Sequence, residues 1–518
     1  MKTFVARFRS MITGVLSGFD RLVFRGTLLP LYRPGGMFFF LEDAGVRLLD
    51  FKKYVQDTSE QVKDAALREA RDGGRPTRYL RSSGTDKKEL ARKLLAENPT
   101  DQGIVCALYG VEPCTSFEYH RSADPKQRGL KLRPRKCLHV YQYRLHPVFG
   151  PMNVRIQTWF PFNIQICLNG RDWLAQQLVA AGCDDFLRYD NCFTRLGDLE
   201  LAQRLAKDQL ATDWPAALTA IARSINPLHD AIFEPSPMDY YWSAYQTEWA
   251  TDVMFRDPAA LAALYPALVK HATHHFASPD VMRFLGRKVH GGFNGELTGS
   301  FKRRPEGVRV KHWLAGNSIK MYDKGGSVLR VETTIAQPRG FKVLRPKQDE
   351  PDGKLDWRPL RKGVADLHRR AQVSQRANDS YLDALGVVDD STLISEVLDQ
   401  VARPARYRGR RVRAIRTGDP EDVALLAAIS RGEFATAGFR NRDLRLLLHP
   451  QTATADPDQR RRVAARVGRR IRILRAHGLI KKIPKSHRYR LTPKGNLLTA
   501  AISATRNATV KQLLREAA

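Results

Sequence analysis

Apolar and polar residues alternate most regularly in residues 308–335, which read VRVKHWLAGNSIKMYDKGGSVLRVETTI. Gly and Asn interrupt the alternation at residues 315–317 and 324–326, and both residue types accept the positive φ of a tight turn. Alternation with a period of two is typical of a strand with one buried face. The stretch therefore predicts three short strands, joined by two tight turns, with one apolar face and one polar face.

The polar face of these strands is our candidate active site or nucleic-acid-binding surface. Its members are Lys320, Tyr322, Lys324, Arg330 and Glu332. Glu332 can bind Mg²⁺ or Mn²⁺ because hard cations prefer carboxylate oxygen, the cations can stabilise phosphate charge, and Tyr322 can attack phosphorus once its proton is withdrawn. The alternative is a structural ion pair of Glu332 with Lys320 or Arg330, with Tyr322 packed over it.

The N-terminal half predicts strands separated by helices. Residues 18–27 form an expected strand that carries Asp20, a candidate second metal ligand if this strand adjoins the one with Glu332. Further strands are expected at residues 154–168 and 192–196, a helix at residues 171–182, and Asp198 as the cap of a helix that follows it. This order predicts an α+β fold with a mostly antiparallel sheet.

Residues 213–288 are expected to be mostly helical. They include an aromatic cluster, Tyr240, Tyr241, Trp242 and Tyr245. Such a cluster at helical spacing is more often core, while stacking on nucleic-acid bases is the alternative.

Two basic segments are expected to be irregular. Residues 121–136 hold seven Lys or Arg against one acid and predict a loop between strands, either solvated or in contact with a phosphate backbone. Residues 403–416 hold seven Arg and no acid and predict a flexible connector. We therefore expect a core region at 1–385, with a subdomain boundary near residue 215, a basic linker at 386–420 and a C-terminal domain at 421–518.

The C-terminal pattern is three helices followed by two strands. The helices are expected at residues 421–431, 440–448 (with Asn441 as a cap) and 458–477, and the strands at 478–480 and 487–491. The sequence LRAHGLIKKIPKSHRYRLTPKG resembles the junction between recognition helix and wing in winged-helix DNA-binding domains. The resemblance covers about 80 residues and implies a winged-helix domain.

The third of these helices has an apolar seam and a cationic face. Val463, Val467, Ile471 and Leu474 form the seam, and between Arg460 and Lys494 there are fourteen Lys or Arg and no acid. These two faces suit docking in the major groove, with backbone contacts from the wing. The residues expected to contact nucleic acid are Arg462, Arg466, Arg469, Arg472, Lys481, Lys482, Lys485, Arg488 and Arg490.

The charge of the whole chain strengthens this interpretation. It has 518 residues, with 86 Lys plus Arg and 54 Asp plus Glu, giving a formal net charge of +32. Such an excess indicates a polyanionic partner, with DNA expected and RNA as the alternative.

No lipidation motif supports a membrane partner, and charges interrupt the apolar run at the N-terminus. The six Cys form no C-x-x-C pair, so we expect reduced thiols and a cytoplasmic location.

The central strands also carry a family resemblance. The pattern K-x-Y-D-K-x(5)-R-x-E, at Lys320, Tyr322, Asp323, Lys324, Arg330 and Glu332, is similar to one in replication initiators of rolling-circle plasmids and filamentous phages. The resemblance implies strand nicking with a divalent metal and a tyrosine nucleophile. We therefore expect a replication initiator or transposase-like protein of a mobile element, and a non-catalytic DNA- or RNA-binding protein is the alternative.

Overall fold

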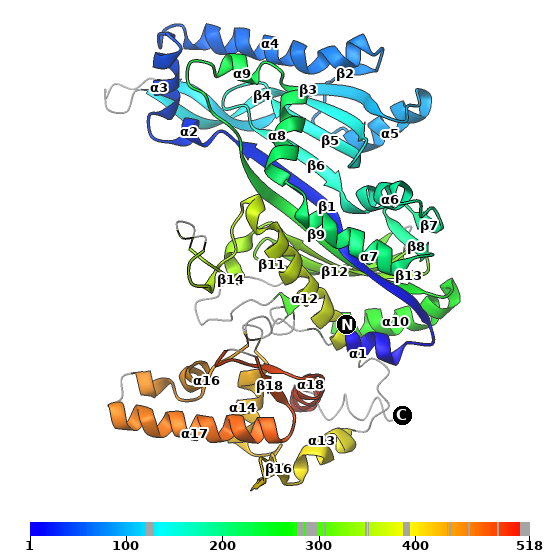
Figure 1. Ribbon diagram of the computed structural model, residues 1–518, viewed down its shortest axis with the longest axis vertical. Helices are drawn as coiled ribbons and strands as arrows, with labels where there is room; N and C mark the ends of the chain where they lie inside the picture. The colour runs from blue at the N-terminus through cyan, green and yellow to red at the C-terminus, as the bar shows by residue number, and fades with distance from the viewer. Residues whose placement is uncertain are drawn as a thin grey trace. The chain divides into compact units, whose positions relative to one another are not determined.

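The structure is a computed structural model of the chain in which helices flank one large, mostly antiparallel sheet (Figure 1). It describes all residues except 121–128, 275, 277–280, 282–283, 286–297, 305–306, 348–349, 351, 387–393, 432–433, 435–437, 454–455, 484–485 and 508–518. The sheet has eleven strands in the order β10-β11-β12-β13-β9-β1-β6-β5-β4-β3-β2. The expected mostly antiparallel sheet with flanking helices is confirmed.

The strands of the large sheet have these bounds: β1 (Ile12–Thr27), β2 (Thr77–Leu80), β3 (Gly103–His120), β4 (Gly129–His146), β5 (Gly150–Gln157), β6 (Ile164–Asn169), β9 (Tyr241–Phe255), β10 (Thr298–Arg304), β11 (Gly307–Leu314), β12 (Asn317–Lys324) and β13 (Val328–Ile335). Among the described residues, four two-stranded sheets accompany it: β7 (Phe186–Tyr189) with β8 (Cys192–Leu196), β14 (Lys342–Arg345) with β15 (Asp356–Pro359), β16 (Ala405–Tyr407) with β17 (Arg410–Val412), and β18 (Ile480–Lys482) with β19 (Tyr489–Leu491).

The chain divides into two compact units that interleave along the sequence. The first unit comprises Met1–Val15, Ala250–Leu360 and Arg369–Ala518, and the second comprises Leu16–Trp249 and Arg361–His368. Strands β1 and β9 each contribute residues to both units. The sequence did not predict this interleaving.

In the second unit, helices pack on both faces of the sheet. Its helices are α2 (Leu29–Tyr32), α3 (Gly36–Asp43), α4 (Phe51–Asp72), α5 (Lys87–Glu97), α6 (Gly170–Ala180), α7 (Leu199–Asp208), α8 (Trp214–Ile225) and α9 (His229–Ile232). On one face the ring of Phe24 on β1 packs on Trp214 of α8, and the Gln142 amide on β4 donates to the carbonyl of Ala66 in α4. On the other face Tyr141 and Tyr143 of β4 pack in an apolar cluster with α5. The expected cap is confirmed, since the Asp198 carboxylate accepts the backbone N–H of Leu201 in α7.

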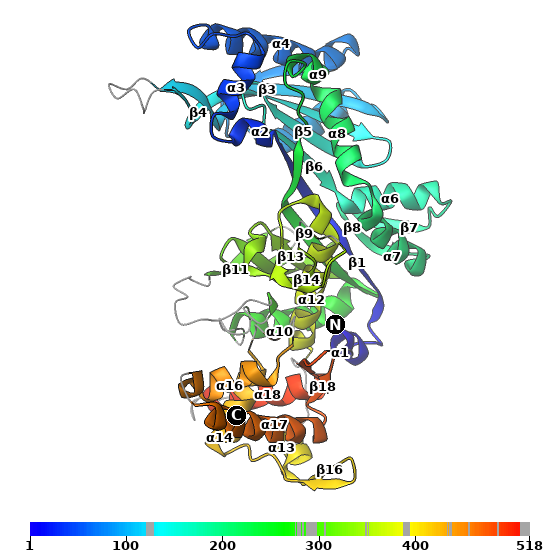
Figure 2. The ribbon, with the colours of Figure 1, turned by 60° about the vertical axis from the view of Figure 1, so that its left-hand side comes forward.

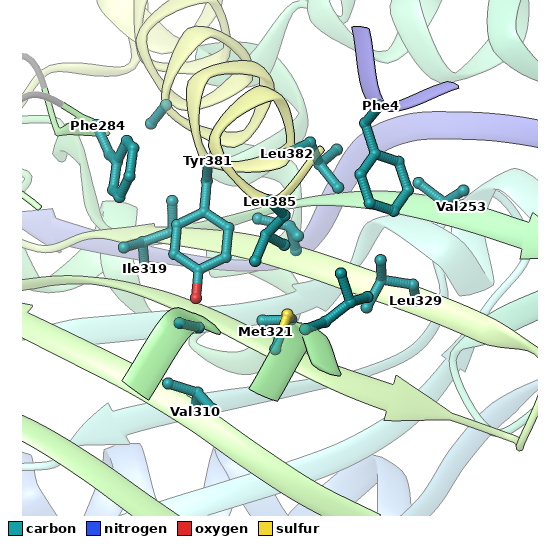
Figure 3. Close-up of a cluster of buried hydrophobic side chains, with 14 of the residues drawn as sticks. Phe4, Val253, Phe284, Val310, Ile319, Met321, Leu329, Tyr381, Leu382 and Leu385 are labelled. Carbon is teal, nitrogen blue, oxygen red and sulfur yellow. The ribbon is translucent and has the colours of Figure 1, made fainter. Parts of the chain in front are cut away.

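In the first unit, α10 (Pro258–His274), α12 (Leu367–Leu385) and α1 (Lys2–Arg7) lie on the apolar face of β11 to β13. Met321 and Leu329 point from the strands toward Tyr381 and Leu382 of α12 (Figure 3). His312 also lies on this face, against the ring of Tyr381, and burial lowers its pKa to about 4. The three strands and the two-faced alternation are therefore confirmed.

Elements after α12 pack around a separate apolar cluster in the same unit. They are α13 (Ile394–Ala402), α14 (Pro420–Ile429), α16 (Asn441–Leu448), α17 (Pro457–Ala476), the β18–β19 hairpin and α18 (Pro493–Asn507) (Figure 2). Val467, Ile471 and Leu474 are buried in that cluster, with Val463 at its margin, so the predicted seam of α17 is confirmed. Asn441 is not the cap of α16, because the Asp443 carboxylate accepts the backbone N–H of Arg440 at this end.

Three expectations about local structure are wrong. Residues 241–255 form the long strand β9 rather than helix. The basic run at residues 121–136 is a strand from Gly129 onward, and the rest of it lies outside the described residues. The basic connector contains the β16–β17 hairpin, and Ile415 packs in the C-terminal apolar cluster. Arg413 is fixed there by an ion pair with Asp422, with 2.6 Å between Nη1 and Oδ2.

Candidate active site

The polar face of β12 and β13 is held together by direct cross-strand pairs. Lys320 lies opposite Glu332, and Tyr322 lies opposite Arg330. Lys320 Nζ is 2.6 Å from Glu332 Oε1, and the Tyr322 hydroxyl donates to Glu332 Oε2 at 3.0 Å. The Glu332 side chain is fully buried, while that of Lys320 is 14% exposed. The structure thus brings together three of the predicted site residues around one carboxylate.

Arg330 is occupied by a different partner. Its guanidinium makes a two-point contact with Asp252 of β9, with Nε to Oδ1 at 2.5 Å and Nη2 to Oδ2 at 2.9 Å. Both side chains are fully buried. This geometry makes Arg330 a link between β13 and β9. The predicted contact of its guanidinium with phosphate is therefore not favoured. Lys324, at the end of β12, is buried as well.

Asp20 and Glu248 are carried by two adjacent strands of the sheet, β1 and β9. The Asn169 and Asn191 side-chain amides both donate to Asp20 Oδ1, the first at 3.3 Å. The Gln246 amide donates to Glu248 Oε1 at 2.9 Å. These amide donors orient the two carboxylates.

One carboxylate oxygen from each of Asp20, Glu248 and Glu332 lies within 4.8 Å of those of the other two. Asp20 and Glu332 are buried, and Glu248 is half-buried. Clustered carboxylates repel one another in a low dielectric, and the Lys320 ammonium, 2.6 Å from Glu332, offsets part of this repulsion. Three carboxylate oxygens are ligands that Mg²⁺ or Mn²⁺ prefers, and the triad can therefore bind a metal ion.

The predicted ligands Asp20 and Glu332 do converge, but not on adjoining strands. Strand β9 lies between β1 and β13 and supplies Glu248. Sequence reasoning missed Glu248 because residues 213–288 were expected to be mostly helical. The available signal was the alternation at the start of β9, where Trp242 and Ala244 are buried and Tyr241 and Tyr245 are exposed.

The polar face extends to β11. Arg309 lies opposite Tyr322, and Lys311 lies opposite Lys320. The Lys311 ammonium sits over the ring of Trp313, 4.3 Å from its centroid. Cations therefore stand on β12, which adjoins β13, and on β11, the next strand beyond it, as a site for phosphate would require.

Most of the predicted nucleic-acid-binding residues of the C-terminal elements are exposed. These are Arg462, Arg469, Arg472, Lys481, Lys482 and Arg490. Arg466 is exposed but pairs with Glu421, with 2.7 Å between Nη2 and Oε1. Arg488 is half-buried, donates to the carbonyl of Gly438 at 2.9 Å and lies over the ring of Trp357. Lys485 lies outside the described residues.

Comparisons with protein-family models, with curated protein sequences and with solved structures found no match to this chain. Of the helices in the described part of the chain, none has the length and apolar character needed to cross a membrane.

Proposed function

We propose that the chain is a nucleic-acid-binding enzyme of a mobile element, a replication initiator or transposase-like protein, that nicks DNA by metal-dependent phosphoryl transfer. The observation that carries the proposal is the convergence of Asp20, Glu248 and Glu332 within 4.8 Å. Lys320 beside Glu332 adds a cation to the same place. Carboxylates that hold a divalent ion next to a phosphate-binding cation are what phosphoryl transfer requires.

Each residue of the centre has a distinct role in this mechanism. Asp20, Glu248 and Glu332 would hold Mg²⁺ or Mn²⁺, which supplies charge neutralisation at the phosphate. Lys320 orients Glu332 and offers its ammonium to a phosphate oxygen. The Tyr322 hydroxyl already donates a hydrogen bond to Glu332, so this carboxylate is placed to accept the hydroxyl proton during attack. Attack by Tyr322 Oη would form a bond to phosphorus and break the bond from phosphorus to the 3′ oxygen, leaving a 3′ hydroxyl.

We also propose that the elements from α14 to β19 form a winged-helix domain that binds DNA. The order of three helices and a hairpin supports this proposal. The exposed arginines of α17 and the exposed Lys481 and Lys482 on β18 supply the cations that backbone contacts need.

The test is incubation of the purified protein with supercoiled plasmid and with labelled single-stranded DNA, in Mg²⁺ or Mn²⁺ and in chelator. We expect metal-dependent nicking that is lost in Glu248→Gln and Glu332→Gln. A matched control is Glu396→Gln, because Glu396 is exposed on α13. Tyr322→Phe should abolish a covalent protein–DNA adduct if Tyr322 is the nucleophile.

A non-catalytic nucleic-acid-binding protein is the second candidate. The ion pair of Lys320 with Glu332 favours this non-catalytic function, because a buried ion pair of this kind can have a purely structural role. Binding without nicking or adduct in any metal would establish this second function. Nicking that survives Glu248→Gln and Glu332→Gln would show that the active site lies elsewhere.

A further inference from the structure

The hairpin of β16 and β17 is anchored at its base to the C-terminal apolar cluster. Val401 before it and Ile415 after it are both buried in that cluster, and the backbone N–H of Ile415 donates to the carbonyl of Val401 at 2.9 Å. The carbonyl oxygen of Arg413 lies 3.0 Å from Nε2 of His477, the residue that follows α17. The hairpin is therefore held at both of its ends.

The hairpin also contacts the cationic side of α17. The Arg475 guanidinium, near the end of α17, lies over the ring of Tyr407 on β16, 5.1 Å from its centroid. It also lies over the ring of Tyr489 on β19, at 5.8 Å. Because Arg475 follows the exposed Arg472 by three residues, both are on the same side of the helix. One arginine therefore joins both hairpins to this side of α17.

The outer part of the hairpin exposes four arginines, and it projects from the helices of the C-terminal cluster (Figure 2). They are Arg406, Arg408, Arg410 and Arg411. Among the described residues none of the four forms an ion pair, whereas the neighbouring Arg413 pairs with Asp422. Arg406 lies directly opposite Arg411 in the strand register, and like charges in opposed positions destabilise a strand pair. A bound polyanion relieves this repulsion.

The tip of the hairpin is the two-residue turn of Arg408 and Gly409, between the paired Tyr407 and Arg410. Both turn residues have positive φ, 50° and 76°. A two-residue turn of this kind prefers Asn, Asp or Gly at its first position, and a long side chain there is uncommon. The turn therefore does not explain an arginine at position 408, whereas contact of its guanidinium with a ligand does.

We propose that this hairpin binds the minor groove of duplex DNA, with the Arg408 side chain inserted into the groove. The minor groove is about 6 Å wide, so it excludes a two-stranded ribbon but admits one side chain from the tip of a hairpin. Arg406 and Arg411 contact the phosphates that line the groove. A planar, weakly hydrated guanidinium suits the narrow groove of A·T-rich DNA, and all seven cations of residues 403–416 are Arg.

The position of the hairpin fits this groove. With the cationic side of α17 in the major groove, the end of the helix that carries Arg475 lies near the phosphate backbone between the two grooves. A hairpin at that end reaches across this backbone into the minor groove. The inference rests on the DNA binding by α17 that is part of the proposed function, but it does not depend on the carboxylate centre.

The experiment is fluorescence anisotropy of the full chain with three labelled duplexes of one length, in chelator so that metal-dependent nicking does not occur. A central run of base pairs is A·T in the first duplex, I·C in the second and G·C in the third. Inosine lacks the 2-amino group of guanine, so I·C combines the minor-groove pattern of A·T with the major-groove pattern of G·C. The wild-type chain should bind the A·T and I·C duplexes about tenfold more tightly than the G·C duplex.

Variants of the tip separate its structural role from binding. Arg408→Asn introduces a residue that the turn prefers, so thermal unfolding should show equal or higher stability, while the preference for A·T and I·C pairs should be lost. Arg408→Lys keeps the charge and should lose most of the preference without a change in salt slope. Arg406→Gln should keep the preference and lower the salt slope by about 0.9, the value for one phosphate contact on a duplex. The matched control, Arg506→Gln on the exposed part of α18, should change neither.

Several outcomes would overturn the inference. A wild-type chain that binds none of the duplexes would refute both the inference and the DNA-binding part of the proposed function. Equal binding of the three duplexes by the wild-type chain, or a preference that persists in Arg408→Asn, would refute only the minor-groove contact. A loss in Arg408→Asn that is equal for the three duplexes would reduce the hairpin to a phosphate contact. In these last cases DNA binding by α17 still stands.

Discussion

At the scale of single residues, the contacts of Arg330 and Glu332 separate two roles that the sequence could not distinguish. Both side chains are fully buried on the same strand. Arg330 makes a two-point ion pair with Asp252, whereas Glu332 meets Lys320 and Tyr322. The first arrangement pairs one cation with one carboxylate, and the second places the Lys320 ammonium beside a carboxylate that has two further carboxylates nearby. The second therefore brings together three carboxylate oxygens, the ligands that a divalent metal ion prefers.

The buried pair of Arg330 with Asp252 should behave as a structural unit. Arg330→Met should lower the free energy of unfolding by about 3–5 kcal/mol, because it leaves the Asp252 carboxylate buried without its partner. The double variant Arg330→Met/Asp252→Leu should recover much of this loss, since no buried charge remains. Urea unfolding followed by circular dichroism measures both. A double variant no more stable than the single one would contradict this role.

Burial of His312 predicts a pH dependence of stability. Its pKa is lowered from 6.5 to about 4 by burial, so folding favours the neutral ring. This stabilisation is complete above pH 6.5 and is lost as the pH falls from 6.5 toward 4. Between pH 7 and pH 5 the wild-type chain should lose about 2 kcal/mol more than His312→Phe. Urea unfolding at the two pH values measures the difference, and equal losses would show that His312 does not titrate in this range.

At the scale of elements, the success of prediction depended on whether a strand has two different faces. Strands β11 to β13 were predicted because one face packs under α12 and the other is polar. Strand β9 was missed because its second half is buried and reads WATDVMF, without alternation at a period of two. Strand β13 is buried at every position too, but its sequence keeps the alternation. The seam of α17 was predicted since it faces a single apolar cluster. Glu248 could not be assigned to the site, because the pairing of β9 with β1 and β13 depends on contacts distant in sequence.

The cationic side of α17 gives a prediction for that element. Arg469→Gln and Arg472→Gln should each weaken DNA binding at all sequences and lower the salt slope by about 1, because each removes one phosphate contact. Arg506→Gln on the exposed part of α18 is the matched control. Titrations at several salt concentrations give the slopes. Unchanged slopes in both α17 variants would exclude this helix from the DNA interface.

At the scale of the whole molecule, the carboxylate centre draws one residue from each of three strands that are far apart in the chain, β1, β9 and β13. A local motif cannot encode such a site. The sequence predicted two of its members from the polar face around Glu332 and the strand around Asp20. The third member required the order of strands in the sheet. The same long-range pairing gives the chain interleaved units rather than domains in sequence order.

Because the three ligands come from distant parts of the chain, a bound ion should stabilise the folded state against unfolding. Mn²⁺ at about a hundred times its dissociation constant should add about 2.7 kcal/mol, since it binds the folded chain and not the unfolded one. Differential scanning calorimetry with Mn²⁺ and then with chelator measures the effect. Glu248→Gln should lose most of the shift and Glu396→Gln should keep it. A full shift in Glu248→Gln would place the ion away from the triad, and the metal-dependent function would then need a different centre.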